Sequence, residues 1–137
     1  ELGAEITGYS SAFGSAALAE TWGAGSAFDG SPNSAWSSAG DGDEAWIEVR
    51  LAQRSQIDRI EFWTRFMSDG TAQIFEFTIT TGDGRVYGPY ELPDAEQAYG
   101  FDVNFEAEVL RFDVVDSSGG NTGAVEIAVY GAPLSEE

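Results

Sequence analysis

Apolar and polar residues alternate with a period of two along much of the chain after residue 45. Ile47, Val49 and Leu51, for example, alternate with Trp46, Glu48 and Arg50. This pattern predicts β-strands that have one face on a core. The other apolar sets with this spacing are Ile60 and Phe62; Phe75, Phe77 and Ile79; Tyr99, Phe101, Val103 and Phe105; Leu110, Phe112 and Val114; and Val125, Ile127 and Val129.

Turn residues separate these runs. Gly82-Asp83-Gly84 predicts a hairpin, and Pro89 marks an edge strand or a bend. Together with a short strand at residues 5–11, the runs give about seven or eight strands, which is typical of an antiparallel β-sandwich. Long crossings at residues 12–45 and 64–72 favour a jelly roll. We therefore expect an all-β protein with one domain at residues 1–132 and a linker or tail at 133–137.

The charge balance narrows the range of partners. The chain has a net charge of −18, its only basic residues are six arginines, and it lacks Cys and His. Such a chain repels nucleic acid and anionic membranes, and it suits a salt-rich marine or halophilic setting. Serine nucleophiles are plentiful, but without His or Lys the chain lacks the usual base that would activate one, so we do not expect an enzyme. No apolar run approaches the ~18 residues of a membrane span.

The stretch from Ser26 to Trp36 is rich in oxygen donors. Asp29-Gly30 and Ser31-Pro32-Asn33 force tight turns, which place a carboxylate, hydroxyls and freed carbonyls close together. Ca²⁺ binds about 6–8 such oxygens. A turn capped by its own Asp side chain is the simpler alternative for an Asp-Gly pair.

Several motifs resemble the discoidin domains, also called coagulation factor V/VIII type C domains, and the related family 32 carbohydrate-binding modules. They are, in chain order, Ala27-x-Asp29-Gly30-x-Pro32-Asn33-Ser34-x-Trp36, Trp46-Ile47-Glu48-Val49-Arg50-Leu51, Ile57-Asp58-Arg59-Ile60 and Gly123-Ala124-Val125-Glu126-Ile127-Ala128-Val129-Tyr130-Gly131. They span about residues 5–131. The resemblance implies a β-sandwich of the galactose-binding-like type.

The resemblance also implies a structural Ca²⁺ site. Its ligands would be the carboxylates of Asp29 and Glu126, the hydroxyl and carbonyl of Ser34, and the carbonyls of Ser26, Ser31 and Ala124. A plain surface role for Glu126 is the alternative. Asp41, Asp43 and Glu44 form another acidic cluster, which predicts a solvated turn, with a second weak Ca²⁺ site as the alternative.

In the resembled sugar-binding modules, an Arg in the loop after a central strand donates to sugar hydroxyls. Arg65 matches that position, and a salt bridge is its alternative role. We expect a ligand site built by Trp22, Arg65, Asp69 and Asn121. Trp22 would either stack on a sugar or plug its own loop.

We therefore expect a non-catalytic carbohydrate-binding module, stabilised by Ca²⁺, within a larger protein that is secreted or on the cell surface. Its partners would be a polysaccharide or cell-surface glycan and the other domains of that protein. A cell-adhesion or protein-binding discoidin domain without sugar recognition is the alternative. Membrane binding is disfavoured by the charge.

Overall fold

The fold is an antiparallel β-sandwich in a computed structural model that describes residues 4–11, 23, 36–67 and 69–134. The elements in chain order are β1 (Ala4–Tyr9), β2 (Trp36–Ser37), the 3₁₀-helix η3 (Gly42–Glu44), β3 (Trp46–Thr64), β4 (Ile74–Thr81), β5 (Val86–Glu91), β6 (Tyr99–Ser117) and β7 (Gly123–Pro133). Every strand pairing among them is antiparallel. The predicted fold class is confirmed.

Two long strands build both layers. The first part of β3 pairs with β1, and its second part pairs with β7. β6 runs beside β3 throughout and also pairs with β4, which carries the edge strand β5. In each of these long strands the sequence pattern predicted two separate short strands. No Gly or Pro interrupts residues 52–59, so β3 continues across the bend, where its register shifts between Arg50 and Ser55.

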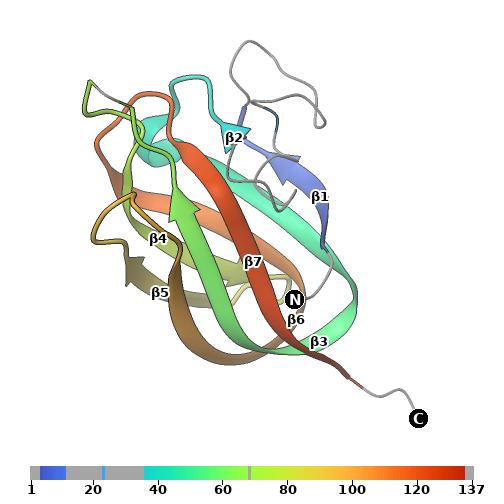
Figure 1. The fold of residues 1–137 in the computed structure, drawn as a ribbon. Helices are drawn as coiled ribbons and strands as arrows, with labels where there is room; N and C mark the ends of the chain where they lie inside the picture. Colours follow the sequence, from blue (N-terminus) through green and yellow to red (C-terminus); the bar gives the residue numbers. More distant parts are fainter. Residues whose placement is uncertain (1–3, 12–22, 24–35, 68, 135–137) are drawn as a thin grey trace.

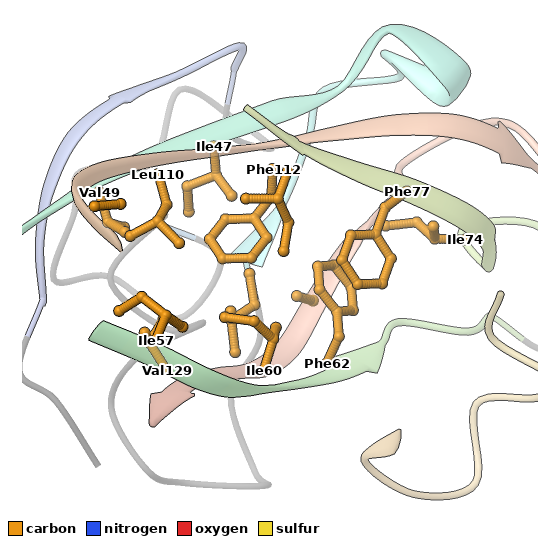
Figure 2. Packing of buried hydrophobic residues seen from close by; sticks show 14 of the residues in the cluster. Ile47, Val49, Ile57, Ile60, Phe62, Ile74, Phe77, Leu110, Phe112 and Val129 are labelled. Atoms are coloured by element: carbon orange, nitrogen blue, oxygen red, sulfur yellow. The ribbon is translucent and has the colours of Figure 1, made fainter. Parts of the chain in front are cut away.

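The core lies between the two layers. Figure 2 shows Ile47 and Phe112 from one layer facing Ile60 and Phe62 from the other. These four side chains are at most 2% exposed. The alternation that predicted the core therefore holds through the centre of the sandwich.

Two bulges break the alternation elsewhere. The register of β4 against β6 shifts on both sides of Glu76, so Ile74 is buried, whereas Phe75 is 37% exposed. The register of β3 against β7 shifts opposite Val125, so Ala124 is buried and Val125 is half-buried. The prediction that Phe75 and Val125 face the core was wrong, because a bulge adds a residue and reverses the pattern beyond it.

The turns follow the sequence signals. β4 and β5 form the predicted hairpin, in which the Thr81 amide donates to the Arg85 carbonyl at 2.9 Å. Pro89 lies in β5, which is the last strand in the sheet order, so its predicted edge position is confirmed. The described part of the chain contains no helix long and apolar enough to cross a membrane.

Candidate functional site

Three loops meet at one end of the sandwich, namely residues 38–45, 65–73 and 118–122 (Figure 1). The 118–122 loop holds the other two together. The Gly42 amide donates to the Gly120 carbonyl at 3.0 Å, and the Ala72 amide donates to the Gly119 carbonyl at 2.8 Å. Gly119 and Gly120 have φ angles of +83° and +78°, which glycine adopts without strain. The three loops therefore form one hydrogen-bonded unit.

Thr122 secures the base of this unit. Its hydroxyl donates to the Gly42 carbonyl at 2.8 Å and lies 3.3 Å from the Ser38 hydroxyl. Ser38 and Thr122 are fully buried. Buried polar groups with partners fix a backbone in one arrangement, so these contacts give the loops a rigid support.

Arg65 lies where the sequence analysis expected it, at the end of β3. One of its terminal nitrogens, Nη1, donates to the Ser37 hydroxyl at 3.0 Å and to the backbone carbonyl of Asn121 at 2.5 Å. Burial lowers the pKa of the half-buried guanidinium. The structure thus brings Arg65 and Asn121 together, with Arg65 joining β2 to the 118–122 loop.

Asp69 is exposed in the same loop as Arg65. Its carboxylate accepts hydrogen bonds from the Thr71 hydroxyl at 2.6 Å and from the Thr71 amide at 3.0 Å. Both bonds lower the pKa of Asp69, the hydroxyl most. Asp69 therefore closes the turn around Gly70. Trp22, the fourth residue expected at this site, lies outside the described residues.

The expected Ca²⁺ ligands fall in two groups. Ser26, Asp29, Ser31 and Ser34 lie outside the described residues, whereas Ala124 and Glu126 lie on β7. β2 begins at Trp36, the last residue of the oxygen-rich stretch, and Trp36 pairs with Ala124. The end of that stretch therefore pairs with β7 at Ala124, and Glu126 follows Ala124 by two positions on the same strand. The donor types, carboxylate, hydroxyl and carbonyl oxygens, are those that a hard cation such as Ca²⁺ prefers.

The acidic cluster at residues 41–44 includes η3. Asp41 accepts a hydrogen bond from the Ser11 hydroxyl, and Asp43 accepts one from the Ser117 hydroxyl, each at 2.5 Å. Asp43 and Glu44 are exposed, as a solvated turn requires. Within the described residues, no group of three or more acidic side chains is placed to hold a metal ion. The turn is thus exposed at Asp43 and Glu44, while Asp41 and Asp43 also attach it to Ser11 and Ser117.

A residue that the sequence analysis did not select stands out beside Arg65. Phe66 is 56% exposed, which is unusual for so large an apolar side chain. It borders a hollow of about 380 Å³ that is also lined by Gln73, Asp94, Ala95 and Glu96. We name this the Phe66 hollow. Trp63 holds the lining segment 94–96 in place, because its indole N–H donates to the Ala95 carbonyl at 2.8 Å.

Comparison with known proteins agrees with this fold. The family model of the F5/8 type C domain matches residues 5–127, so the chain belongs to this family. The search of curated proteins gives no match.

Solved structures with this fold come from several carbohydrate-related proteins. The family 32 carbohydrate-binding module of C. perfringens NanJ, in complex with galactose, is 17% identical, with 93% of this chain and 92% of that one covered and a TM-score of 0.71. The C-terminal domain of a Bacteroides fragilis chitobiase is 17% identical, with 96% and 95% covered and a TM-score of 0.75. A chitosan-binding module of a Paenibacillus chitosanase/glucanase is 19% identical, with 95% of each chain covered and a TM-score of 0.62. At these identities the likeness establishes the fold.

Proposed function

We propose that this domain binds carbohydrate without catalysing a reaction, and that the sugar contacts the Phe66 hollow. The observation that carries the proposal is the exposed Phe66 ring, which lies next to polar side chains at the loop end of the sandwich. A sugar ring presents an apolar face of C–H groups and a rim of hydroxyls. Sites for such ligands combine an aromatic surface with a few polar groups that fix the orientation.

The lining of the hollow supplies both parts. Phe66 can cover the apolar face of a pyranose, while Asp94 and Glu96 can accept hydrogen bonds from hydroxyls. The Gln73 amide can donate and accept. Among the described residues, no basic side chain lines the hollow, and the net charge of the whole chain is −18. We therefore expect neutral or amino sugars to bind in preference to uronates and sulfated sugars.

The setting of the domain is part of the same proposal. We place it outside the cell, as one module of a larger protein, where Ca²⁺ is available to bridge the 26–35 stretch and β7. Structures with this fold include modules of a chitobiase, a chitosanase/glucanase and a family 31 glycoside hydrolase. Their likeness supports a role in holding a protein on its glycan.

A screen of the purified domain against immobilised oligosaccharides tests the proposal. The screen should include galactose, N-acetylgalactosamine, N-acetylglucosamine and glucosamine units, with uronates as comparators. We expect binding to at least one neutral or amino-sugar glycan, with a dissociation constant in roughly the micromolar to millimolar range. If none of the immobilised glycans retains the domain in the presence of Ca²⁺, the proposal is contradicted. Protein binding by an adhesion-type domain then becomes the better account.

A further inference from the structure

β3 and β6 bend at the end of the sandwich that lies opposite the three loops (Figure 1). Residues at these bends line a second hollow. It has a volume of about 320 Å³. Its lining comes from three chain segments: the bend of β3, the β4–β5 turn and the part of β6 before its bend. Its polar residues are Arg54, Gln56, Asp83, Arg85, Asn104 and Glu106, and Tyr87 adds an aromatic ring. We name this the Arg85 hollow.

Two loose ion pairs stand in this hollow. Arg54 Nε lies 3.5 Å from the Glu106 carboxylate, and Arg85 Nε lies 3.5 Å from the Asp83 carboxylate. By contrast, the Arg50–Glu108 pair on the outer face closes to 2.7 Å. Side chains of both loose pairs are about half exposed or more. Such solvated pairs are weak, so both guanidinium groups keep N–H donors for a ligand.

Amide groups stand beside these pairs. The Gln56 side-chain NH₂ donates to the side-chain oxygen of Asn104 at 2.7 Å. Within the described part of the chain, this leaves the side-chain NH₂ of Asn104 and the side-chain oxygen of Gln56 without a hydrogen bond. One donor and one acceptor are therefore available at the same wall of the hollow.

An aromatic pair completes the lining. The Tyr87 ring stacks on the buried Phe105 ring, with 4.4 Å between centroids and 23° between planes. This packing fixes the half-buried Tyr87 side chain at the wall of the hollow. A ligand thus meets a fixed aromatic side chain as well as polar groups.

We propose that the Arg85 hollow is a second saccharide site, independent of the Phe66 hollow, which takes a neutral sugar unit. A hydroxyl accepts a hydrogen bond from a guanidinium while donating one to a carboxylate, so it can bridge the Arg54–Glu106 and Arg85–Asp83 pairs. An anion would face the two carboxylates, and a cation would face the two arginines. The inference extends the proposed function, since a module with sites at both ends can join two glycan chains.

Chemical-shift titration of the ¹⁵N-labelled domain tests this inference. The probes are galactose, glucose and N-acetylglucosamine, each taken to ~100 mM because single sugars bind with millimolar dissociation constants. Galacturonate and glucosamine serve as charged comparators. We expect a neutral sugar to shift the Arg54 and Arg85 Nε–H signals and the Asn104 side-chain NH₂ signals. The Nε–H signals of Arg50 and Arg111 should remain in place.

Matched variants separate this site from the first. Arg85→Gln should weaken binding at this hollow about tenfold, the loss expected for one charge-assisted hydrogen bond. Arg50→Gln, which removes an arginine outside the hollow, should have no effect. Phe66→Ala should leave the Arg54 and Arg85 shifts intact.

Three results would overturn the inference: no shift at Arg54 and Arg85 with any neutral sugar, shifts with galacturonate alone, or shifts that disappear in Phe66→Ala. If residues around Phe66 respond while Arg54 and Arg85 do not, only the second site fails. If neither end responds to any sugar, the proposed function fails as well.

Discussion

Replacing Phe77 with alanine is expected to lower the free energy of unfolding by about 3–5 kcal/mol. The Phe77 side chain is 1% exposed and packs beside the Phe62 ring (Figure 2). Its ring centroid is 4.5 Å from that of Phe62, 5.4 Å from Tyr90, 5.6 Å from Phe101 and 6.3 Å from Phe112. Alanine would remove all four ring contacts and leave a cavity between the two layers.

A neighbour on the same strand provides the control. Phe75 is 37% exposed because of the bulge in β4, so Phe75→Ala should cost less than about 1 kcal/mol. Urea denaturation of both variants measures the difference directly. An equal loss of unfolding free energy in the two variants would contradict the bulge. It would indicate instead that Phe75 and Phe77 both face the core, as regular alternation requires.

Removal of Ca²⁺ is expected to have the second-largest effect. The proposed ion would join the Asp29 loop to Glu126 on β7, and it would bind the folded state alone. An ion at ~100 times its dissociation constant adds about 2.7 kcal/mol to the free energy of unfolding. Excess EDTA should therefore lower the melting temperature by on the order of 10 °C.

Two variants connect this effect to the site. Glu126→Gln should melt at a lower temperature than the unchanged domain in Ca²⁺, and EDTA should change its melting temperature little. Glu108→Gln, which alters a glutamate on the outer face, should keep the full response to EDTA. A melting temperature that EDTA leaves unchanged in the original domain would contradict the proposed ion.

The sequence predicted the fold where each strand is regular. Ile47, Val49 and Leu51 alternate with polar or partly exposed residues, and all three are buried. It failed at Phe75 and Val125, because a bulge depends on how two strands pair, which the period of one strand does not reveal. It also divided β3 into two strands, because exposed residues 52–54 at the bend resemble a turn.

The candidate site was harder to predict than the fold. The resemblance placed Arg65 and Asn121 in neighbouring loops, and the structure joins them through the Asn121 backbone carbonyl. Tertiary packing decides which acceptors within the protein an Arg side chain donates to. The sequence therefore could not predict this hydrogen bond. Phe66 was missed because exposure depends on what covers a loop. A large apolar residue after Arg65, in a loop rich in Ser, Asp and Gly, was the available signal.

Titration of the strongest oligosaccharide from the screen into the original domain, Phe66→Ala and Phe75→Ala tests the central claim most directly. We expect Phe66→Ala to bind about tenfold more weakly, because burial of a side chain as large as Phe contributes roughly 1.5–3 kcal/mol of free energy. Its urea midpoint should be unchanged, and Phe75→Ala should bind like the original domain. Unchanged affinity in Phe66→Ala would contradict saccharide binding at this hollow.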